Sequence, residues 1–209
     1  MSAPVGPPVA ELADRQRFLL ATAFWLILDS GTAVPAARLA AAAGLPAGQV
    51  EADLATLAGA GRIRRDDDGA VLGSLGLTMI STCHQVRIGT EVRHTWCALD
   101  AVGILGALAA DGRIDSENPD TGRRFGLDFA AGLPTGHDPA WVLFVAARVV
   151  VASVIDQWCP RVRFFADAAS AREWAAARQI AGEPMRLLAA TEFGAGLWRR
   201  SLAAAPRPA

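Results

Sequence analysis

The stretch RIRRDDDGAVL, residues 62–72, decides how the first third of the chain folds. Its centre, Asp66-Asp67-Asp68-Gly69, is a turn signal, because an Asp-Gly pair supplies the positive φ that a tight hairpin turn requires. Apolar and polar residues on both sides of the turn can pair as short strands. We therefore predict a β-hairpin, and the segments before it show which kind of module it completes.

Those segments have apolar residues at helical spacing. The pattern predicts three helices, over residues 10–28, 35–43 and 46–58. Gly31 and Gly44 follow the first two and are expected to end them, since glycine adopts the left-handed conformation that closes many helices. Three helices and a hairpin make a winged helix-turn-helix pattern, which we assign to residues 10–75. The Pro-rich residues 1–9 before it are expected to be loose.

A winged helix-turn-helix is often a DNA reader. Here the predicted recognition helix, residues 46–58, has acidic side chains and no basic one, so it would repel phosphate. The hairpin supplies Arg62, Arg64 and Arg65, but the three aspartates of its turn offset them. The whole chain has 20 basic and 21 acidic residues and a formal charge of -1. We therefore interpret the module as a packing unit and expect no nucleic-acid partner.

The remainder of the chain, residues 76–205, is predicted to be an α+β domain in which helices flank a mixed sheet that the winged-helix-like module packs on. Predicted strands cover residues 77–88, 125–129, 162–165 and 185–189, and residues 141–155 read as a strand followed by a helical turn. Predicted helices cover residues 97–110, 170–178 and 191–202. Ser170 and Glu173 form a capping-box pattern, and residues 111–124 are expected to be a turn-rich loop.

Composition excludes several classes of protein. Apolar residues make up 52% of the chain and charged residues 20%, which is enough to build a core and incompatible with disorder. The chain has no lysine, so a lysine Schiff base is excluded. The most apolar stretch, residues 141–155, is interrupted by Arg148 and is shorter than the roughly 20 residues of a membrane-spanning helix. With no signal-peptide pattern and three cysteines, we expect free thiols, no membrane partner and a cytoplasmic location.

Two of the cysteines share a local pattern, because Trp96 precedes Cys97 and Trp158 precedes Cys159. Asp100 lies three residues after Cys97, on the same face if Cys97 opens a helix, where the helix N-terminus is expected to lower the thiol pKa. Two sulfurs can grip a soft metal and a carboxyl can carry a proton. A free cysteine also packs as a small hydrophobe, so spacing alone leaves a structural interpretation open.

Other chemistry finds little support. Cys83 has no carboxyl within helical reach and is interpreted as structural, inside the strand predicted over residues 77–88. The histidines, His84, His94 and His137, are scattered, and the chain has no zinc-ligand spacing and no nucleotide-binding glycine pattern. We expect no cofactor.

The stretch Trp96-Cys97-Ala98-Leu99-Asp100, together with Cys159 and the Phe164-Phe165-Ala166 that follows it, resembles the organomercurial (alkylmercury) lyase family. The similarity continues in Gly76-Leu77-Thr78, Trp174 and Glu192-Phe193-Gly194, and the winged-helix-like module is also a family trait. Segment 101–120 departs from the family pattern, with Asn118 where a further cysteine is expected. That departure leaves the substrate range open.

The resemblance implies protonolysis of a carbon–mercury bond, which releases a hydrocarbon and Hg(II). Cys97 and Cys159 would bind mercury as thiolates, and Asp100 would carry the proton, with its pKa raised by burial. Trp96, Trp158 and His94, which stands where the family often has tyrosine, are expected to line the pocket. The Hg(II) product would pass to a mercuric reductase or to low-molecular-weight thiols.

Two alternatives from other classes remain. A regulator could sense a soft metal through its thiols and bind DNA through the winged-helix module. A noncatalytic metal carrier could use the same fold without cleaving anything. Asp100 favours the enzyme, because a carrier needs no proton donor beside its thiols.

Overall fold

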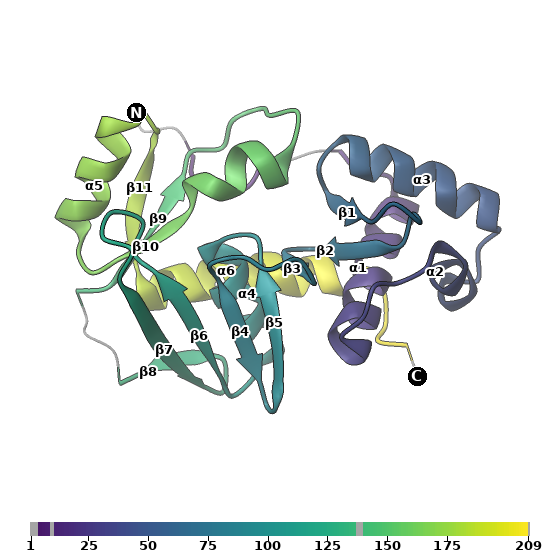
Figure 1. Cartoon of the computed structure of the whole chain (residues 1–209), viewed down its shortest axis with the longest axis horizontal. Helices are drawn as coiled ribbons and strands as arrows, with labels where there is room; N and C mark the ends of the chain where they lie inside the picture. The colour runs from purple at the N-terminus through teal and green to yellow at the C-terminus, as the bar shows by residue number, and fades with distance from the viewer. Residues whose placement is uncertain (1–3, 9–10, 137–139, 209) are drawn as a thin grey trace.

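The computed structural model describes residues 4–8, 11–136 and 140–208. A helical module lies at one end of the molecule and two sheets with their helices form the other (Figure 1). The module contains α1 (Asp14–Ser30), α2 (Ala36–Ala43) and α3 (Ala47–Gly59), followed by the hairpin of β1 (Ile63–Arg65) and β2 (Val71–Ser74). Gly31 and Gly44 end α1 and α2 with φ of 62° and 64°, so these predicted helix ends are confirmed.

The hairpin is the start of a larger sheet. Its further strands are β3 (Leu77–Thr78), β4 (Gln85–Ile88), β5 (Glu91–Thr95), β6 (Gly112–Glu117), β7 (Arg124–Ala130) and β8 (Leu133–Thr135). The strand order is β1-β2-β3-β5-β4-β6-β7-β8. The α+β class is confirmed, but the sheet expected to be mixed is antiparallel in every pair made by the described strands. The predicted division after residue 75 falls between β2 and β3, which pair, so the sheet crosses it.

Two predictions within this sheet are wrong. Residues 77–88 form two strands, β3 and β4, separated by a loop, and residues 111–124 contain β6 instead of being a loop throughout. The composition of β6 suggests a loop, yet Ile114 and Ser116 are buried and Arg113 pairs with Asp115 and Asp128. Pairing with β4 and β7, which local composition does not reveal, makes this segment a strand.

A smaller sheet has the order β10-β9-β11, with β9 (Val142–Ala146) fully buried between β10 (Arg163–Phe165) and β11 (Gly182–Arg186). α5 (Ala168–Ala177) packs beside it. The predicted cap is wrong, because Asp167 is the capping residue and its Oδ1 accepts a hydrogen bond from Ser170 N at 2.8 Å. α6 (Leu187–Leu202) begins earlier than the predicted residue 191.

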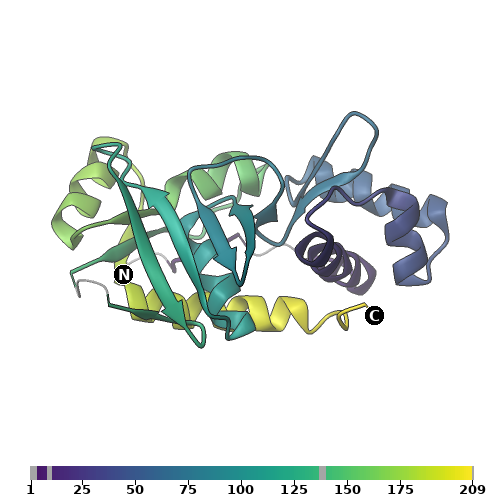
Figure 2. The same ribbon diagram turned by 60° about the horizontal axis from the view of Figure 1, so that its bottom comes forward.

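Two helices form the centre of the second part, α4 (Ala98–Leu108) and α6. They approach closely because glycines face each other: a Cβ on Gly194 would lie 2.9 Å from Gly103 Cα, and one on Gly106 would lie 2.9 Å from Ala195 Cβ. α6 then continues along one edge of the molecule to α1 (Figure 2). The position of α4, including its N-terminus, is thereby fixed by close packing against the longer helix α6.

The chain before α1 contradicts the expected loose N-terminus where it is described. Val5 pairs with Ala147, Gly6 N donates to Ala146 O at 3.1 Å, and Arg148 N donates to Pro4 O at 2.7 Å. Residues 4–6 are therefore hydrogen-bonded to the end of β9 and to the two residues that follow it. Residues 1–3 and 9 of the segment lie outside the described residues.

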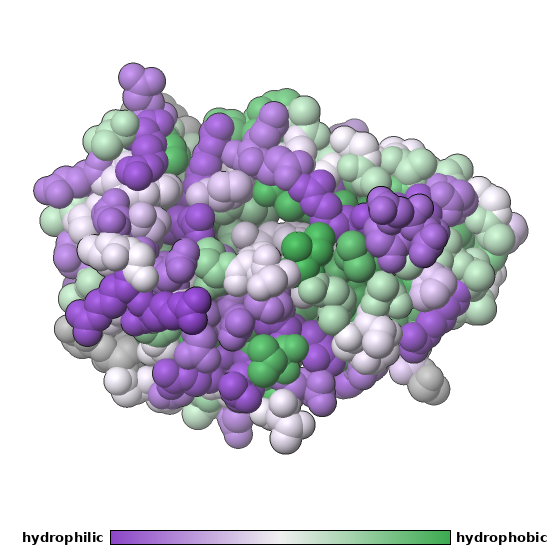
Figure 3. Space-filling view, viewed as in Figure 1, coloured by the Kyte–Doolittle hydropathy of each residue, from purple (hydrophilic) through white to green (hydrophobic). Residues whose placement is uncertain are grey.

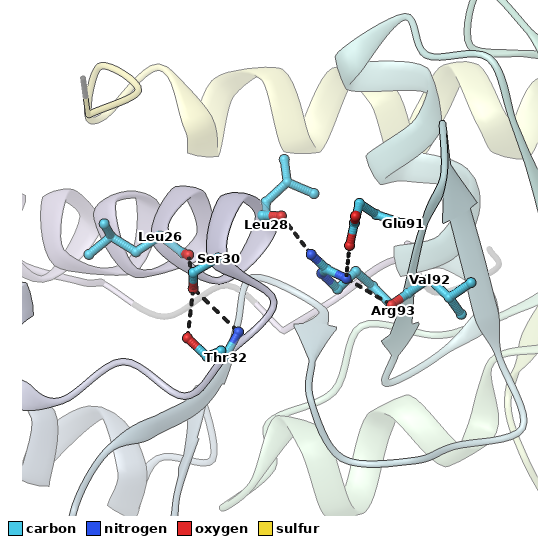
Figure 4. A network of polar contacts seen from close by, with 7 residues as sticks. All are labelled: Leu26, Leu28, Ser30, Thr32, Glu91, Val92 and Arg93. Atoms are coloured by element: carbon cyan, nitrogen blue, oxygen red, sulfur yellow. Dashed lines mark hydrogen bonds and ion pairs between the residues drawn. The ribbon is translucent and has the colours of Figure 1, made fainter.

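Arg93 on β5 joins the helical module to the sheet (Figure 4). It is 5% exposed, and its guanidinium donates to Leu28 O at the end of α1 at 3.1 Å and to Val92 O at 2.9 Å, and pairs with Glu91 at 3.0 Å. At the other side, Trp25 Nε1 of α1 donates to Ala205 O at 3.3 Å. The two parts of the chain therefore share buried polar contacts as well as the sheet.

The surface seen in Figure 3 is mostly hydrophilic over the sheet end and more apolar over the alanine-rich α2 and α3. Among the described residues, no helix has both the length and the apolar composition that crossing a bilayer requires.

Candidate active site

The N-terminus of α4 positions the first two predicted site residues. Cys97 is the N-cap, with extended backbone angles, and Asp100 is the third residue of the helix. Asp100 Oδ2 accepts a hydrogen bond from Cys97 N at 2.8 Å, so the side chain of the third helical residue returns to the N-cap backbone. The pattern is a capping box built with cysteine and aspartate, so the geometry that starts the helix also places thiol beside carboxyl.

Cys159 reaches the same place from a distant part of the chain. It follows a π-helical turn, η1 (Val154–Trp158), and opens a 3-10 turn, η2 (Cys159–Arg161). Val162 N donates to Cys159 O at 3.1 Å, and Ala98 N donates to Val162 O at 3.3 Å, which ties this turn to the start of α4. One ligand atom from each of Cys97, Asp100 and Cys159 lies within 4.8 Å of the others. The predicted convergence of the three residues is confirmed.

All three side chains are buried, and burial controls the pKa of the carboxyl. Asp100 is 4% exposed, and desolvation raises its pKa to about 7, against the lowering effect of its hydrogen bonds with Cys97. A carboxyl with this pKa can hold a proton near neutral pH and also release it.

The thiols depart from expectation. The pKa of Cys97 is raised well above its ordinary value, chiefly by desolvation, so the expected lowering at the helix N-terminus is wrong: burial outweighs the helix dipole. For Cys159, side-chain interaction with Cys97 lowers the pKa most, yet burial and the nearby Asp100 charge together leave it raised. Arg62 acts in the lowering direction on Cys159. Both sulfurs are therefore held as thiols until something replaces their protons.

A cavity of about 330 Å³ opens onto Asp100 and Cys159. Its walls are largely apolar and include the predicted Trp96 and Trp158 together with Leu12, Leu20, Leu75, Val154, Leu197 and Trp198. Trp158 Nε1 donates to Ala147 O at 3.3 Å, which fixes that indole. The buried Trp96 Nε1 has no hydrogen-bond partner among the described residues.

A turn between β2 and β3 lies directly over the carboxyl. Gly76, with φ of +86°, is so close that a Cβ there would lie 2.4 Å from Asp100 Oδ1. The preceding Leu75 also has a positive φ, 45°, and its carbonyl accepts a hydrogen bond from Trp198 Nε1 of α6 at 2.7 Å. In the sequence, Gly76 contributes only to the family resemblance, and its contact with Asp100 depends on a fold that spacing does not reveal.

One of the predicted pocket residues does not line the cavity. His94 on β5 is not among the residues that line the cavity; its Nδ1 accepts a hydrogen bond from Thr82 N, in the loop between β3 and β4, at 3.1 Å. None of the described residues that line the cavity falls in segment 101–120, whose Asn118 accepts backbone hydrogen bonds within its own turn. The divergence of that segment therefore lies away from the cavity wall.

The remaining cysteine lies elsewhere. Cys83 is in the loop between β3 and β4, outside the strands, and its sulfur is 2.7 Å from Arg163 Nη1. The neighbouring His84 is buried, with Nδ1 2.7 Å from Ser116 Oγ, and desolvation lowers its pKa to about 3. His137 lies outside the described residues.

Two buried sulfurs and a carboxyl beside an apolar cavity form a donor set that is chemically suited to a soft metal carrying an organic group. Comparison with known proteins agrees with this class. The chain matches the alkylmercury lyase family model, MerB, over residues 77–199. It therefore belongs to the alkylmercury lyase family of enzymes.

Individual relatives extend the match. The alkylmercury lyase of Staphylococcus epidermidis is 28% identical over 149 residues, 71% of this chain and 67% of the relative. That of Pseudomonas putida is 31% identical over 112 residues, 53% of this chain and 52% of the relative. The alignments thus span from about half to about two thirds of these relatives. The crystal structure of the mercury-bound form of MerB2 is 26% identical, with a TM-score of 0.83, and the match covers 92% of this chain and 93% of that one.

Proposed function

We propose that this protein cleaves the carbon–mercury bond of organomercurials by protonolysis, with Cys97 and Cys159 as mercury ligands and Asp100 as the proton carrier. The observation that carries the proposal is the buried cluster of two sulfurs and one carboxyl, whose ligand atoms lie within 4.8 Å of one another. Mercury and its organic group are the substrate here, so the protein needs no resident metal for the reaction.

Mercury exchange comes first. The substrate, written R–Hg–X, gives up its exchangeable ligand X as the two thiols lose their protons and bind mercury through sulfur. Thiolates are the donors that soft metals prefer, so mercury replaces protons that burial otherwise keeps on the sulfurs. One thiol proton leaves with X and the other passes to Asp100, which lies beside Cys97.

Carbon then receives the proton. Asp100 donates it to the carbon atom of R, which takes the electron pair of the carbon–mercury bond as that bond breaks. The overall change is R–Hg–X with two thiols giving R–H, mercury held by two thiolates, and HX, with no change of oxidation state. A pKa of about 7 suits Asp100 to both accepting and donating this proton.

The cavity suits an apolar R group, because leucine, valine and indole side chains form most of its wall. Release of Hg(II) requires competing thiols, so the product would pass to low-molecular-weight thiols or to a mercuric reductase.

The test is hydrocarbon release by the purified protein. We expect benzene from a phenylmercury salt and methane from a methylmercury salt, with a small thiol present to remove Hg(II). Asp100→Ala and Cys159→Ser should reduce release by at least about a hundredfold, since each removes a reacting group. Cys83→Ser is the matched control, because Cys83 is outside the cluster, and it should keep the full rate.

Other outcomes identify other functions. Tight binding of phenylmercury with no hydrocarbon released would mean a carrier. A promoter-DNA mobility shift that responds to mercury would mean a regulator. Full activity in Asp100→Ala would reject the proton carrier while leaving the two-sulfur site intact.

A further inference from the structure

The three arginines at the start of the hairpin differ in whether they have an ion-pair partner. Arg65 makes a two-point ion pair with Glu51 at 2.6 and 2.9 Å and donates to Gly69 O at 2.6 Å. Arg64 pairs with Asp156 of η1. Both charges are therefore matched within the protein. Arg62, the first of the three, has no carboxylate partner among the described residues.

Arg62 lies where the hairpin meets the segment that carries Cys159. Ile155 N of η1 donates to Gly61 O at 3.3 Å, and a Cβ on Gly61 would lie 2.1 Å from Ser153 Oγ. In Figure 1 the green helical segment that precedes β10 accordingly lies beside the β1 end of the module. The backbone that presents Arg62 is thus in contact with the turn that ends at Cys159.

The Arg62 side chain enters the active-site cavity. It lines the same walls as Asp100 and Cys159, and its one hydrogen bond to a described residue runs from Nη2 to Pro8 O at 2.9 Å. Desolvation lowers its pKa, while the charge of Cys159 acts in the opposite direction. Burying part of a guanidinium without a paired anion costs free energy of folding, and an anion that binds nearby during function would offset that cost.

The other charged residues that line the cavity are two arginines and one aspartate. The arginines are cations and cannot pair with Arg62; Arg17 is itself paired with Asp14, and Arg200 is exposed. Asp100 is the acidic residue among the described cavity-lining side chains; it accepts a hydrogen bond from Cys97 N, and because burial raises its pKa to about 7 it is only partly ionised near neutral pH. The anion that remains is the pair of thiolates.

We propose that Arg62 balances the negative charge of the complex in which both thiolates hold mercury with its organic group still attached. This inference rests on the proposed function. R–Hg carries one positive charge and two thiolates carry two negative charges, so the complex has a net charge of minus one. When the proton reaches carbon, that charge moves to the Asp100 carboxylate in the same cavity, and Arg62 balances it there as well. The winged-helix module then contributes an electrostatic group to the active site.

The test separates charge from packing. The experiment uses an Asp100→Asn background, which we expect to bind substrate without cleaving it. Phenylmercury and inorganic Hg²⁺ are titrated against a competing thiol, and mercury binding is followed by quenching of tryptophan fluorescence. Hg²⁺ with two thiolates is neutral, whereas phenylmercury with two thiolates is an anion. Arg62→Gln should therefore weaken phenylmercury binding by about tenfold or more and change Hg²⁺ binding by less than about threefold.

Matched variants complete the comparison. Arg62→Lys keeps the charge and should restore most of the phenylmercury affinity, and Arg65→Gln removes a hairpin arginine whose charge is matched outside the cavity and should change neither affinity. Arg62→Met serves in place of Arg62→Gln if the latter does not fold. Equal weakening for both mercury species, or no weakening for either, overturns the proposal.

The two proposals fail separately. If the wild-type protein releases no hydrocarbon, the proposed function is wrong, yet the binding comparison still reports on Arg62. If hydrocarbon is released and the neutral Arg62 variants treat both mercury species alike, only the charge-balancing role is wrong.

Discussion

Asp100 carries the clearest consequence at the scale of a single residue. Its pKa in the folded protein is about 7, well above the ordinary 3.8. Between these two pH values the folded protein holds a proton that the unfolded chain has released. A raised carboxyl pKa therefore costs stability as pH rises through this window, by up to about 4 kcal/mol, and the cost is constant above it.

Asp100→Asn has no carboxyl to titrate at this position. As the pH rises from about 4.5 to about 7.5, we therefore expect the free energy of unfolding of the wild type to fall relative to that of the variant. Urea unfolding at several pH values measures it, and the subtraction removes the titration of groups common to both proteins. A difference that does not vary with pH would show that Asp100 titrates normally.

The turn over the carboxyl belongs to the scale of the element. Gly76→Ala would force a Cβ against Asp100 and strain a backbone with φ of +86°. We expect a loss of about a hundredfold in kcat/KM for phenylmercury, because the carboxyl must move. Gly89→Ala is the control: φ is +59° there, but a Cβ meets nothing within 4 Å, so it should lose about 1 kcal/mol of stability and keep its activity. Equal activity in the two variants would contradict the contact.

The contact of α1 with β5 gives a second prediction at this scale. Arg93→Ala removes a buried guanidinium and leaves Leu28 O at the end of α1 without its donor. We expect the free energy of unfolding to fall by about 2–3 kcal/mol. Arg87→Ala on β4, where the side chain is exposed, should change it by less than about 0.5 kcal/mol. Chemical denaturation followed by circular dichroism compares them.

Over the whole molecule, the continuous sheet predicts that the helical module does not unfold by itself. β2 pairs with β3, Arg93 links α1 to β5, and the segment after α6 returns to Trp25. We expect coincident urea transitions for tryptophan fluorescence and far-ultraviolet circular dichroism. Two separated transitions would show that residues 10–75 are an independent domain.

How far the sequence predicts this molecule depends on whether the signal is local. The helix ends at Gly31 and Gly44, the hairpin turn and the Cys97–Asp100 spacing are set within a few residues, and these predictions hold. The β6 strand depends on partners distant in the chain, and its polar composition hides it.

The same distinction applies at the site. The family resemblance linked Cys159 to Cys97, which spacing alone could not do. It did not indicate that Arg62 of the hairpin enters the cavity, or that His94 turns toward Thr82. In the sequence, Arg62 is one of three hairpin arginines whose charges the turn aspartates are expected to offset, and only the position of η1 distinguishes it from Arg64 and Arg65.

The cavity wall is assembled from segments near both ends of the chain, since Pro7 and Leu12 meet Leu197 and Ser201 around the sulfur and carboxyl. Directed evolution toward bulkier organometals therefore has its most useful library positions at Leu12, Leu20 and Leu197, which shape the space without contributing a reacting atom.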